Sequence, residues 1–210
     1  MLTIYIYAMG TLADWEIGNV MAELHSKRFF KKTAPDVTIK MVSHSTAPIQ
    51  TMGGLTIIPD CLVEEIIADQ QSLLILPGSD TWSNPEHFPI LEKAREFLSL
   101  NLPVAAICGA TVALANVGLL NDRPHTSNGP GFLEMVCPTY IGQNFYVDEP
   151  AVTDKSLITA SSTGALLWTK QIIQQLDVFA PETLTHWYNY FSTGDSAHYF
   201  ALAQSLSSED

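Results

Sequence analysis

Short apolar runs alternate along this chain with longer segments in which apolar residues recur at helical spacing. A continuous apolar run bounded by turn residues is typical of a strand that is buried on both faces of a sheet. Such runs predict strands over residues 2–8, 37–42, 73–76 and 103–107. The helical spacing predicts helices over residues 14–30, 88–100, 109 to about 117, 164–176 and 182–190.

Two further segments have the pattern of β-hairpins. Residues 48–58 are broken by Gly53-Gly54, and residues 151–153 and 156–160 flank a turn at Asp154-Lys155. Between residues 121 and 150 the chain is irregular, with one short helix expected over 132–135. Strands alternating with helices predict a mainly parallel sheet covered on both faces, in an α/β domain that spans residues 1–210.

Composition and charge narrow the function classes. A chain of 210 residues suits one domain with one core. The chain has 22 acidic and 10 basic side chains, which give a formal net charge of -12. Such a charge repels phosphate backbones and anionic lipids, so we expect the protein to bind neither nucleic acid nor a membrane surface. No apolar run approaches the ~20 residues of a membrane span, and no signal peptide opens the chain. The expectation is a soluble cytoplasmic protein without cofactor or metal.

Cys108 stands where parallel α/β sheets bind their ligands, directly after a strand and before a helix. On such a turn the side chain points into the crevice, and the helix N-terminus favours a thiolate with a lowered pKa. The N–H of Gly109 can then point at a developing oxyanion. The alternative is that Cys108 is a small buried hydrophobe. For Cys61 and Cys137, which have no comparable setting, that structural interpretation is preferred.

Several motifs in order along the chain resemble the ThiJ/PfpI family of the class I glutamine amidotransferase-like superfamily. They are Ala13-Asp14-Trp15-Glu16-Ile17-Gly18, Leu76-Pro77-Gly78, Ala105-Ala106-Ile107-Cys108-Gly109-Ala110-Thr111, His125-Thr126-Ser127-Asn128 and Leu157-Ile158-Thr159-Ala160. The resemblance implies a three-layer, flavodoxin-like α/β sandwich with a nucleophile elbow at Cys108, which agrees with the strand pattern.

The same resemblance implies roles for the residues around Cys108. Glu16 matches the acidic residue that reaches the nucleophilic sulfur, and His125 matches a histidine that serves as general base in some relatives. Gly78 and Ser79 match the loop that supplies the second oxyanion donor beside Gly109. Relatives usually carry Gly-Gly in that loop, so Ser79 is a departure, and a left-handed conformation there would be costly. Asp122, Glu134 and Asp148 are all candidates for the third member of a triad.

Two absences bear on the reaction. Peptidase-type and glyoxalase-type relatives often have a histidine directly after the nucleophile, where this chain has Gly109. Glutaminases of the superfamily carry His-x-Glu near the C-terminus, whereas His186 is followed by Trp187-Tyr188. Glutamine-dependent amido transfer is therefore not expected.

Two function classes remain open. The first is a hydrolase or lyase in which Cys108 attacks a small carbonyl or amide compound, with Glu16 or His125 moving protons. The second is a non-enzymatic, redox-responsive or chaperone-like stress protein in which Cys108 oxidises to a sulfinic acid stabilised by Glu16. The resemblance also implies a homodimer. The aromatic helix at Trp187, Tyr188 and Tyr190 either contributes to that contact or closes the core.

Overall fold

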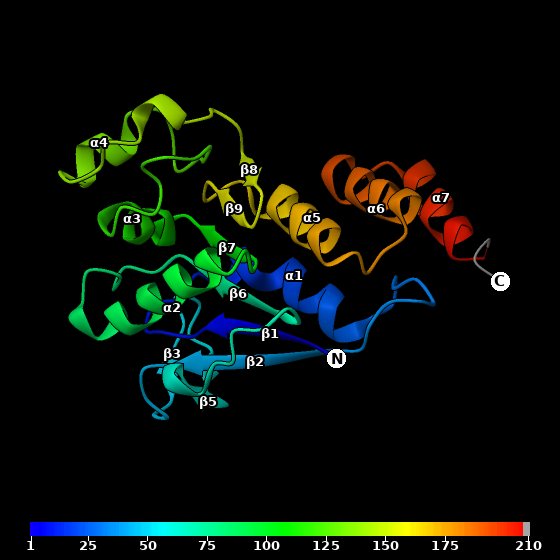
Figure 1. Cartoon of the computed structure of the whole chain (residues 1–210). Helices are drawn as coiled ribbons and strands as arrows, with labels where there is room; N and C mark the ends of the chain where they lie inside the picture. The colour runs from blue at the N-terminus through cyan, green and yellow to red at the C-terminus, as the bar shows by residue number, and fades with distance from the viewer. Residues whose placement is uncertain (208–210) are drawn as a thin grey trace.

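The computed structural model describes residues 1–207, and a seven-stranded sheet forms its centre (Figure 1). The strand order is β5-β2-β1-β6-β7-β9-β8. Every neighbouring pair is parallel except β8 and β9, which form an antiparallel hairpin. The strands are β1 Leu2–Tyr7, β2 Val37–Ser43, β5 Cys61–Leu62, β6 Ser72–Leu76, β7 Val104–Ile107, β8 Ala151–Asp154 and β9 Leu157–Ala160. A separate antiparallel hairpin joins β3 Ile49–Gln50 to β4 Thr56–Ile57.

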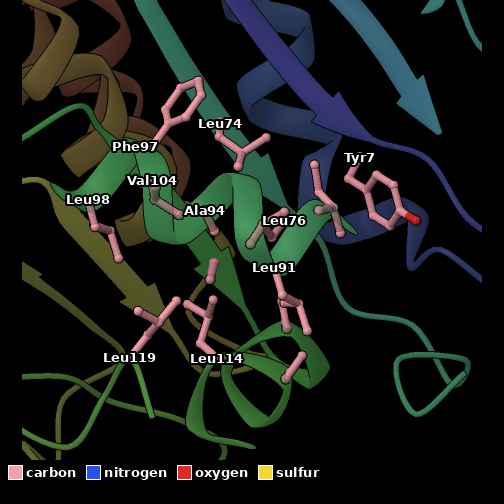
Figure 2. Packing of buried hydrophobic residues seen from close by; sticks show 14 of the residues in the cluster. Tyr7, Leu74, Leu76, Leu91, Ala94, Phe97, Leu98, Val104, Leu114 and Leu119 are labelled. Atoms are coloured by element: carbon pink, nitrogen blue, oxygen red, sulfur yellow. The ribbon is translucent and has the colours of Figure 1, made fainter. Parts of the chain in front are cut away.

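Helices cover both faces of this sheet, so successive residues of a buried strand enter two different cores. Ile4 and Ile6 of β1 pack with α1 Asp14–Ser26, α5 Ala165–Leu176 and α6 Pro181–Thr193. Tyr5 and Tyr7 face the other way, toward α2 Phe88–Ser99 and α3 Gly109–Asn116. Figure 2 shows this second core, where leucines of β6 meet the apolar face of α2. The predicted three-layer α/β fold is confirmed.

The elements differ from the predictions mainly at their ends. Helix α1 stops at Ser26 because Lys27 is left-handed (φ 56°) and its N–H bonds to the Glu23 carbonyl. The β8–β9 turn lies at Lys155-Ser156, one residue beyond the prediction, and Lys155 is left-handed. Short helix α4 spans Phe132–Val136. The pattern did not predict β5, which has two residues, or helix α7 Ser196–Ser207.

The carboxyl ends of β1, β6 and β7 lie side by side at one edge of the sheet. From β1 the chain continues to β2, which lies on one side of β1 in the sheet, whereas β6 and β7 lie on the other side of β1. The direction of the strand order therefore reverses between β1 and β6. Ligands of open α/β sheets bind at such a point. The segments after these three strands carry Glu16, Gly78 and Cys108 respectively.

Candidate active site

Cys108 occupies a strained turn between β7 and α3. Its backbone has φ 56° and ψ −121°, a conformation that non-glycine residues rarely adopt and that clusters at functional sites. The turn is held by the Cys108 N–H, which donates to Ala160 O at 3.0 Å, and by Thr111, whose N–H and hydroxyl both donate to Cys108 O. Cys108 is left half-buried at the carboxyl edge of the sheet. The predicted nucleophile elbow is therefore present.

Glu16 enters the site from the first turn of α1 and is fully buried. Its Oε2 accepts a hydrogen bond of 2.6 Å from the Gly78 N–H. A Cβ at position 78 would lie 2.6 Å from Glu16 Oε2 and 3.0 Å from Cys108 Cβ. Position 78 therefore has to be glycine, because the backbone there is wedged between the carboxyl group and the cysteine.

The other oxygen of this carboxyl group is unusual. Glu16 Oε1 is buried and has no hydrogen-bond partner in the part of the chain that the structure describes. Cys108 is its titratable neighbour, and each group shifts the pKa of the other. A buried carboxylate oxygen without a donor is costly, which points to a site built around the thiol or around a group bound to it.

The backbone amides of Gly109 and Ser79 lie next to each other. A Cβ built on Gly109 would come within 3.4 Å of Ser79 N and 2.9 Å of Ser79 O. The Gly109 N–H hydrogen-bonds to the Cys108 sulfur and acts to lower the thiol pKa. Ser79 does not adopt a positive φ, so the expected backbone cost of replacing the family's glycine is absent. Instead its hydroxyl donates to Gly10 O at 2.8 Å and fixes the loop.

Asn128 is a site residue that the sequence did not single out. Its Nδ2 donates to the Cys108 sulfur at 3.5 Å, while its Oδ1 accepts the Ser162 N–H at 2.9 Å. The signal available in the sequence was its place at the end of the 125–128 motif. Within that motif the resemblance pointed to His125. Which side chain of an irregular loop faces the sulfur depends on tertiary contacts, which the sequence does not specify.

His125 is buried and does not meet the sulfur, so the base predicted from the resemblance is not in place. Its Nδ1 lies 2.8 Å from the Arg123 carbonyl, which only accepts hydrogen bonds, so Nδ1 carries the proton. Its Nε2 then accepts from the Tyr140 hydroxyl at 2.7 Å. Burial lowers the pKa of His125 and raises that of Tyr140 to about 12. Both groups are neutral, and both ring nitrogens of the histidine are occupied.

Within residues 1–207 no carboxylate completes a triad through this histidine. Asp122 lies 3.5 Å from Arg123, and Asp148 lines a surface cavity. The charge of Glu134 reaches His125 and raises its pKa somewhat, against the larger effect of burial. None of the three hydrogen bonds to the ring.

The pKa of the Cys108 thiol is raised, where the sequence predicted a lowered one. Burial is the largest cause, and the charge of Glu16 and its contact with the thiol act in the same direction. The Asn128 amide and the Gly109 N–H lower the pKa, as a helix N-terminus should, but they are outweighed. The pKa of Glu16 is raised by its own burial, and the Gly78 N–H and Cys108 partly offset this.

A polar cavity of about 380 Å³ opens beside Asn128, whose amide hydrogen-bonds to the sulfur. It is lined by Ser127, Asn128, Gly129, Asp148, Glu149, Pro150, Ser161 and Thr163. The other two cysteines lie apart from this site. Cys61 is buried in the core around α2, and Cys137 donates to Asn116 Oδ1 at 2.8 Å.

The family model of the DJ-1/PfpI family matches residues 2–175. The chain belongs to the DJ-1/PfpI family. The "uncharacterized protease" YoaZ of Bacillus subtilis (strain 168) is 43% identical over 203 residues, 97% of each chain. A solved thiJ/pfpI family protein of Bacillus anthracis is also 43% identical, with a TM-score of 0.93 over 97% of each chain. A deglycase of Pyrococcus abyssi is 29% identical over 128 residues, 59% of this chain and 73% of its own. The resemblance drawn from the motifs is confirmed.

Proposed function

We propose that this protein is an enzyme in which Cys108 adds covalently to the carbonyl group of a small aldehyde or 2-oxoaldehyde. The observation that carries the proposal is the pairing at the sulfur: a buried carboxyl group with a raised pKa contacts the thiol, and no imidazole does. Glu16 is thus the group that exchanges a proton with Cys108.

In the first step the sulfur forms a bond to the carbonyl carbon as the thiol proton passes to the Glu16 carboxylate. The carbonyl π electrons move onto oxygen, which the N–H groups of Gly109 and Ser79 stabilise. Return of the proton to that oxygen gives a hemithioacetal. With a 2-oxoaldehyde, Glu16 carries the former aldehyde C–H proton to the neighbouring carbonyl carbon, while the hemithioacetal hydroxyl proton moves to the oxygen on that carbon, and the product is the thioester of a 2-hydroxy acid. Water then releases a 2-hydroxy acid and the free thiol.

A carbonyl substrate fits the site better than a peptide. Cleavage of an amide requires an acid that protonates the departing amine, a task for which histidine is the usual residue. The relatives point in both directions, since one is named a protease and another a deglycase. The occupied nitrogens of His125 favour the carbonyl reaction.

One observation favours a second candidate, a redox role. Glu16 Oε1 is buried beside Cys108 and has no partner. Two equivalents of a peroxide would convert the thiol to a sulfinic acid, with one oxygen of each transferred to sulfur and the remainder released as water or alcohol. A protonated Glu16 would donate its hydrogen to a sulfinate oxygen, and the orphaned oxygen would gain its partner.

Turnover of methylglyoxal to lactate tests the proposal on the full chain. Cys108→Ser should abolish turnover, whereas His125→Gln should retain it within about threefold, because His125 only supports the loop. Casein should not be cleaved. Turnover that survives in Cys108→Ser, or that is lost in a His125→Gln protein with a native circular dichroism spectrum, would contradict the mechanism. If the wild type turns over no aldehyde but gains two oxygen atoms on Cys108 with peroxide, the redox role replaces it.

A further inference from the structure

A second cluster of reactive side chains lies beyond the oxyanion loop. His44 follows β2, and Glu86 and His87 belong to the 3-10 helix Pro85–His87 that precedes α2. One ligand atom from each of the three lies within 4.8 Å of the others. In the described part of the chain no other group of three such residues comes so close. Two imidazoles and one carboxylate form a ligand set typical of Zn²⁺.

His87 is the buried ligand of this cluster. It is 1% exposed. Its Nδ1 and the Tyr7 hydroxyl are 2.8 Å apart, and its Nε2 lies 3.2 Å from Thr81 Oγ1. Hydrogen bonding of one ring nitrogen orients a histidine so that the other can bind a metal. The longer contact, to Thr81, is the one that a metal would more readily replace.

The two remaining ligands, His44 and Glu86, are exposed, whereas His87 is buried. The His44 ring packs edge-on against His87 with centroids 5.7 Å apart. Rotation of these exposed side chains would bring their atoms from this spacing to the spacing of a coordination shell. The negative charge of Glu86 already reaches both His87 and Tyr7.

We propose that His44, Glu86 and His87 form a binding site for a divalent transition-metal ion of the Zn²⁺ class, with water at the fourth position. The site adjoins the oxyanion loop, because Thr81 Oγ1 lies 3.2 Å from His87 and 2.9 Å from Ser79 Oγ. It is independent of the reaction proposed for Cys108, which needs no metal.

Calorimetric titration with ZnCl₂ tests the site in full-length protein that carries Cys108→Ser, since this removes the exposed thiol as a competing ligand. We expect one ion per chain. His44→Ala and Glu86→Gln should each weaken binding by at least about tenfold. Both residues are exposed, so neither substitution should disturb folding, which the melting temperature checks.

A second histidine pair provides the matched control. His186 and His198 of α6 and α7 have ring centroids 6.2 Å apart, and Glu182 lies 3.6 Å from His186. His186→Ala should leave zinc binding unchanged. The Trp82 ring contacts His87 with centroids 5.8 Å apart, so Cu²⁺ should quench its fluorescence, and Trp82→Phe should remove that quenching. Absence of zinc binding, binding unaffected by His44→Ala and Glu86→Gln, or loss of binding in His186→Ala would overturn the proposal.

Discussion

At the sulfur of Cys108, the effects that raise the thiol pKa outweigh those that lower it. The helix N-terminus and the Asn128 amide favour the thiolate, while burial and the charge of Glu16 oppose it. The balance favours the thiol over the thiolate in the free protein, so the nucleophilicity of Cys108 depends on a proton acceptor at the moment of attack. Glu16 has the position for that task, and its raised pKa suits it to exchange the proton.

The substitution Gly78→Ala tests whether the contact between Glu16 and Cys108 depends on the close approach of the Gly78 backbone. The added Cβ would lie 2.6 Å from Glu16 Oε2 and 3.0 Å from Cys108 Cβ, so the carboxyl group must move. Turnover should fall roughly 100-fold, the effect of misplacing a catalytic group by about 1 Å. Overpacking should also lower the free energy of unfolding by about 1–3 kcal/mol. Kinetics and urea denaturation measure the two effects.

Gly18→Ala is the matched control for this substitution. Gly18 lies in the same helix as Glu16, and a Cβ there meets no atom within 4 Å. Alanine is a better helix former than glycine, so stability should rise by about 0.5–1 kcal/mol with turnover unchanged. Equal losses of activity at positions 18 and 78 would show that the Gly78 contact is not specific.

Among the elements, those with both faces buried could be predicted from the sequence, and those placed by tertiary contacts could not. The strand at residues 73–76 is short, wholly apolar and followed by Pro77-Gly78, which is the pattern of a strand buried on both faces. Helix α7 buries only Leu202 and Ser205 among its own residues, so no clear apolar stripe marks it. Strand β5 exists because Cys61 and Leu62 pair with the end of β2.

The candidate site divides in the same way. The resemblance placed Glu16, Gly78 and Ser79 beside Cys108, and parallel strands do bring the loops that follow them to one edge of the sheet. The segment from 121 to 150 has no such constraint. Its contacts turn Asn128 toward the sulfur and bind His125 to Tyr140 and Arg123. The direction of the Cys108 pKa shift also depends on burial, which the sequence does not specify.

On the scale of the whole molecule, the protein combines a strongly negative net charge with two buried histidines. The chain carries a net charge of -12, while His87 and His125 are at most 1% exposed and have lowered pKa values. Within residues 1–207 no helix has the length and apolar character to cross a membrane. The homodimer, the cytoplasmic location and the single-domain organisation stay predictions.

The buried histidines predict a loss of stability in mild acid. Each has a folded pKa below the unfolded value of roughly 6.5, so the unfolded chain takes up more protons as the pH falls through that value, and stability drops. Glu16 acts in the opposite sense, since its folded pKa is raised above its unfolded value. The comparison of variants isolates the histidine effect. The melting temperature should fall less between about pH 7.5 and pH 5.5 in His125→Gln than in the wild type. Equal falls would show that His125 does not titrate with unfolding.

The pairing of Glu16 with Cys108 is tested most directly by the rate of iodoacetamide alkylation of Cys108 as a function of pH, in wild type and in Glu16→Gln. Cys108→Ser corrects for the two buried cysteines. The wild-type thiol should titrate above the ordinary value of roughly 8.5, because burial and Glu16 raise its pKa. Removal of the carboxylate charge should lower that pKa, so that Glu16→Gln alkylates faster at neutral pH while losing turnover. A wild-type pKa at or below the ordinary value, or a thiol pKa that is unchanged or raised in Glu16→Gln, would contradict the account.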